Sequence, residues 1–269
     1  MVEGYLSGRH RSRQRGSSIE FHEFRQYTPG DDLAKVDWRV FARNDKLFLR
    51  TFEQETNLEC HVFLDCSASM GFPENSGRLS KLEYASFFAA SLAWWVISKN
   101  DRVSLTMFDQ GIRKFLPPGS TRKHLNDLLS LLENNTPGSG TSIVETLVRA
   151  QPLLKRKGTL VILSDFFEDP AALFKALNPY LHRGFRVHLF HVLDPAEIQL
   201  EDRGLSRFVD MENAAQLTAH PKALSEAWNA EILSHTRALR SLAASRSCDY
   251  AMTSTADSYF SLFDRLRVH

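Results

Sequence analysis

The chain has 269 residues, of which 43% are hydrophobic and 24% are charged, the proportions of an ordinary globular protein. Lys and Arg number 33 against 32 Asp and Glu, and the net charge of +1 excludes the broad basic surface that nucleic acid or anionic lipid would need. This length suits one large α/β domain with a smaller appendage.

The cysteines and the apolar segments bear on the cellular compartment. Cys60, Cys66 and Cys248 are an odd number without CxxC spacing, which fits neither a disulfide framework nor a thiolate zinc site. No apolar leader opens the chain, and the most apolar helix candidate, residues 82–97, falls short of the roughly 20 apolar residues of a membrane span. We expect a cytoplasmic protein without a membrane span.

Residues 1–57 differ from the rest of the chain and are expected to form an N-terminal extension. They are rich in Arg, Gly, Asp and aromatic residues and show little sustained apolar period, although residues 47–56 alternate as a strand does. Residues 27–32 contain the turn-forming pair Pro29-Gly30. The alternating arginines between residues 9 and 15 are typical either of a solvated arm or of a docking segment for an acidic partner.

From residue 58 onward, short aliphatic runs alternate with helical stretches, which is typical of a parallel sheet covered by helices on both faces. Strands are expected at residues 58–64, 103–108, 159–163, 186–192 and 249–253, with an edge strand or hairpin arm at 205–211. Helices are expected at residues 80–98, 121–132, 143–154, 171–182, 221–245 and 258–266. Residues 112–116 follow 103–108 so closely that the two should form an antiparallel hairpin at one edge. We therefore predict one α/β domain over residues 58–269.

Acidic and hydroxyl side chains follow two of these strands where each strand ends. Asp65, Ser67 and Ser69 come at alternate positions after residues 58–64, and Asp165 follows residues 159–163. Thr141 lies in a Gly- and Ser-rich turn before the second strand. In open parallel sheets, ligands bind beyond the carboxyl ends of the strands, where the strand order reverses. If the two strands are neighbours, two carboxylates and three hydroxyls converge and make an all-oxygen site suited to Mg²⁺ or Mn²⁺.

This pattern resembles the metal-ion-dependent adhesion site of von Willebrand factor A domains. The resemblance rests on Asp65-x-Ser67-x-Ser69 after an apolar strand, the Gly140-Thr141 turn, and Ser164-Asp165 at a strand end. It implies a Rossmann-like fold with a mostly parallel sheet and one antiparallel edge strand. It also implies that the serines and the threonine bind the metal directly, that the acids act largely through water, and that one coordination position accepts an acidic group of a partner.

A second pattern resembles the N-terminal signature of a bacterial family of uncharacterised proteins. The residues that carry it are Glu20-Phe21, Arg25 to Asp32, Val36-Asp37-Trp38 and Ala42-Arg43. Members of that family join the signature to a von Willebrand factor A-like domain and are often encoded beside MoxR-type AAA+ ATPases. The resemblance covers nearly the whole chain and implies two partners, a MoxR-type ATPase and a client protein that bears an acidic residue.

Several assignments stay open at the level of sequence. Ser142 is an alternative to Thr141 as the hydroxyl ligand. The absence of Gly after Asp165 predicts a wider loop there, in which Glu168 and Asp169 either cap helices or crowd the site. Six signature residues form either a buried ionic and stacking network or a surface for the ATPase: Arg25, Asp31, Asp32, Asp37, Trp38 and Arg43.

The leading hypothesis is a non-enzymatic, metal-dependent adaptor that works with a MoxR-type ATPase in chaperone-like assembly or maturation of a client. The alternative is a Mg²⁺-dependent phosphatase or phosphotransferase with Asp65 as nucleophile. That chemistry needs a second acid two residues further on, and this position is Ser67. The phosphate-binding motif GxxxxGK[ST] and the hydrolase motif GxSxG do not occur.

Overall fold

The computed structural model describes residues 19–28, 36, 38–44, 46–54, 58–73, 77–200, 204–209, 211 and 215–266. Contacts divide the chain at residue 57 into two compact units, and the described residues up to 54 belong to one and those from 58 to the other. The arginines between residues 9 and 15 lie outside the described residues.

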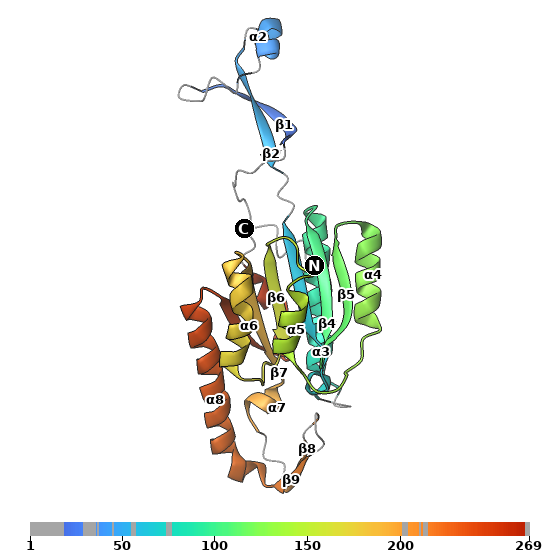
Figure 1. The fold of residues 1–269 in the computed structure, drawn as a ribbon, viewed down its shortest axis with the longest axis vertical. Helices are drawn as coiled ribbons and strands as arrows, with labels where there is room; N and C mark the ends of the chain where they lie inside the picture. Colours follow the sequence, from blue (N-terminus) through green and yellow to red (C-terminus); the bar gives the residue numbers. More distant parts are fainter. Residues whose placement is uncertain are drawn as a thin grey trace. The chain divides into compact units, whose positions relative to one another are not determined.

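The smaller unit is built on two antiparallel strands, β1 (Ile19–Gln26) and β2 (Phe48–Gln54). A short helix, α2 (Trp38–Asn44), lies between them in the chain (Figure 1). The strand expected at residues 47–56 is confirmed as β2. Neither β1 nor α2 was predicted, because the residues before 47 show little sustained apolar period.

The larger unit contains a six-stranded sheet in the order β10-β7-β6-β3-β4-β5 (Figure 1). Its strands are β3 (Glu59–Asp65), β4 (Arg102–Phe108), β5 (Ile112–Gly119), β6 (Thr159–Ser164), β7 (Arg186–Leu193) and β10 (Asp249–Ser254). Five strands are parallel, and β5 pairs antiparallel with β4 at one edge. The predicted hairpin and sheet class are confirmed. The strand order reverses between β3 and β6, because the chain extends the sheet from β3 in one direction and then from β6 in the other.

Helices cover both faces of the sheet. The core on one face includes side chains of α3 (Lys81–Ser98), α4 (Arg122–Glu133) and α9 (Ser261–Arg265). The core on the other face includes side chains of α5 (Ile143–Ala150), α6 (Pro170–His182) and α8 (Pro221–Ser245). Beyond β7 come the four-residue helix α7 (Pro195–Ile198) and the hairpin of β8 (Ser206–Val209) and β9 (Gln216–Ala219), which confirms a hairpin arm near residue 205.

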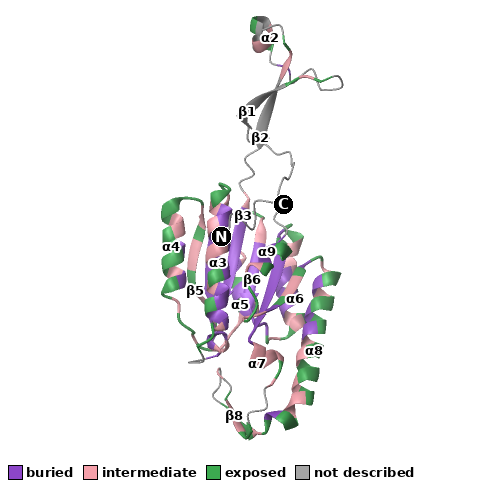
Figure 2. Ribbon diagram, turned by 180° about the vertical axis from the view of Figure 1, so that it is seen from behind, coloured by how far each residue is buried: buried purple, intermediate pink, exposed green. Residues whose placement is uncertain are grey.

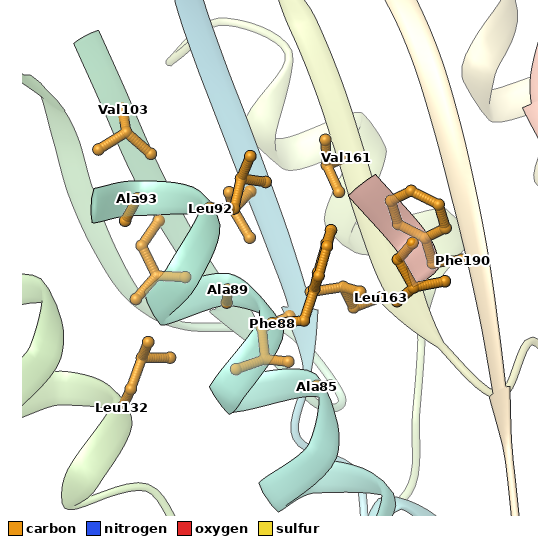
Figure 3. Close-up of a cluster of buried hydrophobic side chains, with 14 of the residues drawn as sticks. Ala85, Phe88, Ala89, Leu92, Ala93, Val103, Leu132, Val161, Leu163 and Phe190 are labelled. Atoms are coloured by element: carbon orange, nitrogen blue, oxygen red, sulfur yellow. The ribbon is translucent and has the colours of Figure 1, made fainter. Parts of the chain in front are cut away.

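The central strands carry the core. All seven residues of β3 are buried, which agrees with a strand covered on both faces, and Figure 2 shows exposure confined largely to the outer helices. Against this strand α3 places Phe88 and Leu92, which point toward the neighbouring strands in Figure 3. The Phe88 ring meets the Phe190 ring edge to face, with centroids 5.1 Å apart. Within the described part of the chain, no helix is long and apolar enough to span a membrane.

Candidate metal site

The two acids singled out from the sequence end adjacent strands. Asp65 is the last residue of β3, and Asp165 directly follows β6. These strands are parallel neighbours, with Leu64 opposite Leu163, so both carboxylates lie at the carboxyl end of the sheet. This is where the strand order reverses, the position at which α/β sheets of this type bind ligands.

Asp65 is fully buried and receives three hydrogen bonds from neutral donors. Its Oδ1 accepts from the backbone N–H of Ser67 at 2.9 Å. Its Oδ2 accepts from the hydroxyls of Ser164 at 2.6 Å and of Thr141 at 3.3 Å. Burial, together with the nearby charge of Asp165, raises the pKa of Asp65 to about 7. The carboxylate therefore lies in a place where its negative charge is costly.

The serines are brought to the same place by a tight turn after β3. The hydroxyl oxygens of Ser67 and Ser69 are 3.2 Å apart. The turn is joined to the loop before α5 by two backbone hydrogen bonds: the N–H of Ala68 donates to the carbonyl of Ser139, and the N–H of Gly138 donates to that of Cys66. These bonds hold the Gly- and Ser-rich loop, and with it Thr141, against the end of β3.

Thr141 and Ser142 have different roles in the structure. The Thr141 hydroxyl donates to Asp65, whereas Ser142 occupies the N-cap position of α5 without a side-chain capping bond. The first N–H of α5, that of Ile143, donates instead to Glu168 Oε1 at 2.6 Å. The geometry therefore favours Thr141 as the loop hydroxyl of the site.

The loop after Asp165 contains two acids that cap helices and one residue with an unusual backbone conformation. Glu168 caps α5, and Asp169 caps α6 by accepting from the N–H groups of Ala171 and Ala172, so both acids are helix caps. Phe166 adopts a φ of 49°, the left-handed region that favours glycine, and its side chain is buried. The position thus keeps the conformation that a glycine would favour, although the residue is aromatic.

The contact that sequence reasoning missed is a buried lysine on Asp165. The Lys81 ammonium donates to Asp165 Oδ2 at 2.7 Å and to Glu197 Oε1 at 2.6 Å, and its side chain is fully enclosed. Lys81 stands in the first turn of α3, where the helix dipole disfavours a cation. The unfavourable position of this lysine is visible in the sequence, but it does not identify the carboxylates that the lysine contacts.

The residues present fit a hard divalent cation. Asp165 Oδ1 is buried and has no hydrogen-bond partner within the described residues, and burial together with the charge of Asp165 raises the pKa of Asp65. The remaining donors are the three hydroxyls, and an oxygen set with two carboxylates is the kind that Mg²⁺ or Mn²⁺ accepts. Within the described ranges, no group of three or more His, Cys, Asp or Glu residues could hold a metal ion, and a cation here would need the hydroxyl oxygens as well as the two carboxylates.

The signature residues of the smaller unit are only partly described. Asp31, Asp32 and Asp37 lie outside the described residues, and Arg25 lies in β1. The Trp38 side chain is 58% exposed, and its ring meets that of Phe41 edge to face with centroids 6.1 Å apart. Arg43, in the last turn of the same helix, is also exposed.

A family model described as "Protein of unknown function DUF58" matches residues 23–238. The chain belongs to the DUF58 family. The match extends across both units and includes every residue of the candidate metal site. The family description gives no activity, and a fold does not by itself define a function.

Relatives of this DUF58 chain include uncharacterized proteins of two mycobacteria. Two of them, the uncharacterized proteins Rv1480 of Mycobacterium tuberculosis and Mb1516 of Mycobacterium bovis, are each 27% identical over 209 residues. Each alignment covers 76% of this chain and 64% of the relative, so the DUF58 chain spans less than two thirds of the length of these relatives.

Solved structures establish the fold class. The conserved hypothetical protein BatB of Bacteroides thetaiotaomicron is 18% identical, with a TM-score of 0.53, covering 77% of this chain and 96% of that one. An aerotolerance-related membrane protein of Bacteroides fragilis is 20% identical, with a TM-score of 0.52, covering 77% and 95%. The larger unit of the DUF58 chain has the topology that its resemblance to von Willebrand factor A domains implied: a mostly parallel sheet, one antiparallel edge strand and helices on both faces.

Proposed function

We propose that this DUF58 protein is a metal-dependent adaptor that captures an acidic side chain of another protein through a cation at the end of β3 and β6. The observation that carries the proposal is the pair of buried carboxylates on adjacent strand ends, with three hydroxyls beside them. Among the described residues, the hydrogen-bond donors to Asp65 are all neutral, and one oxygen of Asp165 has no partner. A divalent cation would satisfy both groups.

Each part of the site would have its own task. The Ser67, Ser69 and Thr141 hydroxyls would hold a Mg²⁺ or Mn²⁺ ion, while Asp65 and Asp165 would supply the negative charge around it. The bound cation would attract a carboxylate of the partner, which is the only chemistry it supplies. Asp65 is enclosed and both its oxygens already accept hydrogen bonds, and residue 67 is a serine rather than an acid; these facts support binding over phosphoryl transfer.

The partners follow from the resemblance of the N-terminal signature. We propose that a MoxR-type AAA+ ATPase and a client with an acidic residue are the two partners, in chaperone-like assembly or maturation of the client in the cytoplasm. The exposed Trp38 and Arg43 of α2 support a role of the smaller unit as a surface for the ATPase, because an exposed tryptophan is enriched where proteins bind one another.

Capture of the acidic client should depend on the cation and on Asp65. Tagged wild-type chain, incubated with a bacterial lysate, should retain acidic client proteins in Mg²⁺ and lose them after chelation. Asp65→Ala should retain no more than chelated wild type. Asp127→Ala is the matched control, since Asp127 is an exposed aspartate on α4 outside the site, and it should bind as wild type does. Equal retention by all forms, with or without chelator, would remove the metal from the mechanism.

A further inference from the structure

A buried cation of the chain itself stands beside the candidate metal site. Lys81 is 0% exposed, and its ammonium lies between two carboxylates, 2.7 Å from Asp165 Oδ2 and 2.6 Å from Glu197 Oε1. The Phe167 ring covers it, with the ring centroid 5.3 Å from Nζ. The arrangement uses one oxygen of Asp165 and leaves Oδ1 as the oxygen available to the site.

The position of Lys81 is unfavourable unless its ammonium pairs with the two carboxylates. Burial of an ammonium is costly, and the first turn of a helix repels a cation. The start of α3 is nevertheless held in place, because the Ser80 hydroxyl and the Glu83 carboxylate cap each other's backbone N–H groups. The rigid start of α3, rather than a mobile surface side chain, therefore holds the positive charge of Lys81 against Asp165.

Glu197 is also held in place by hydrogen bonds, so Lys81 and Glu197 cannot move away from Asp165 together. Its second oxygen, Oε2, accepts from the backbone N–H of Asp194 at 2.8 Å, and its carbonyl accepts from the Trp228 indole at 2.7 Å. Asp194 in turn caps the same short helix, α7, through the N–H of Ala196. The ammonium is thus fixed between an acid of the site and an acid outside it.

We propose that Lys81 is a built-in counter-cation that sets the affinity of the site for a divalent metal by neutralising part of Asp165. A second cation that binds the same carboxylate would meet the repulsion of the ammonium, and at this burial the repulsion is weakly screened. Glu197 acts in the opposite sense, because it withdraws part of the positive charge from the site. The inference rests on the proposed metal-binding function and adds which residues tune it.

The test measures the affinity for Mn²⁺ alone, by titration calorimetry at about pH 8, where Asp65 is ionised. Lys81→Met should bind Mn²⁺ at least about tenfold more tightly than wild type, and Glu197→Gln at least about tenfold more weakly. The double variant removes one positive and one negative charge, so its affinity should return to within about threefold of wild type. A purely structural role predicts instead that the double variant is the most impaired.

The outcomes separate this inference from the proposed function. If wild type binds no Mn²⁺, the metal-binding function fails and the inference with it. If wild type binds Mn²⁺ but both single variants change the affinity in the same direction, or neither changes it, only the role of Lys81 is overturned. Should Lys81→Met not fold, because it leaves two buried acids facing each other, Glu197→Gln and the double variant still decide: weaker binding restored by the second substitution supports the proposal, and anything else contradicts it.

Discussion

In metal-free buffer, the stability of Asp65→Asn relative to wild type should increase as the pH rises from about 4 to about 7, and then level off. Burial and the charge of Asp165 raise the pKa of Asp65 from 3.8 in the unfolded chain to about 7 in the folded protein. Between these values the folded state binds the proton that the unfolded state has released, so the wild type loses stability as the pH rises. The loss is at most about tenfold in the folding equilibrium constant for each pH unit, and the variant does not share it.

The measurement has to be a difference between the two proteins, because other groups titrate in the same range. Burial lowers the pKa of His61 and His188 to about 4 and that of His191 to about 3. These histidines make both proteins less stable as the pH falls below about 6.5, the opposite direction. They cancel when urea unfolding of Asp65→Asn and wild type is compared at each pH. A difference that stays constant from pH 4 to pH 7 would show that Asp65 is ionised throughout.

Replacement of Phe88 with alanine should lower the free energy of unfolding by about 3–5 kcal/mol. Phe88 is fully buried at the centre of the cluster in Figure 3, with its ring centroid 5.1 Å from that of Phe190 and 5.0 Å from that of Phe263. Its removal takes away both the transfer free energy of the ring and the contacts of the side chains around the cavity.

The preceding residue of the same helix is the matched control for this substitution. Phe87 is 48% exposed and contacts the Tyr259 ring with centroids 6.3 Å apart. Phe87→Ala removes an equal number of atoms from the same helix and should cost less than about 1 kcal/mol. Chemical denaturation of the two variants checks the pair. Equal losses at positions 87 and 88 would mean that α3 does not pack on the sheet with Phe88 facing it.

The sheet was predictable because its strands are short runs of aliphatic residues bounded by polar turns. The acids of the site were predictable for a related reason: in β3 and β6, the apolar run stops at the residue where the carboxylate begins, and parallel strands end on the same side. The antiparallel edge followed from the short connection between residues 108 and 112. In each case the information is local in the sequence.

The rest of the site depends on contacts between distant parts of the chain. Lys81 is 84 residues from Asp165 and 116 residues from Glu197, so no local pattern joins them. The Ser164 hydroxyl, which donates to Asp65, had been noted only as part of the strand end. Its role became clear only with the pairing of β3 and β6, since 99 residues separate the two partners.

Two elements of the smaller unit, β1 and α2, were not predicted, and their sequences explain why. The β1 residues Phe21 and Phe24 are three apart, which breaks the alternation expected of a strand. The register of the pairing between β1 and β2 shifts between Phe21 and Glu23, and this irregularity accommodates the break in the alternation. The seven residues of α2 amount to about two helical turns, too few for the helical period to show.

Thermal unfolding measures whether Asp65 and its neighbours hold a divalent cation. After chelation, Mg²⁺, Mn²⁺ or Ca²⁺ is added back to wild type, Asp65→Ala, Thr141→Ala and Ser142→Ala. At ten times the dissociation constant, one site adds about 1.4 kcal/mol, or roughly 2–4 °C for a domain of this size. Cation binding at Asp65 predicts a saturable rise in wild type and Ser142→Ala, no rise in Asp65→Ala, and a reduced rise in Thr141→Ala. A rise of equal size in Asp65→Ala, or no rise in wild type with any of the three cations, would contradict it.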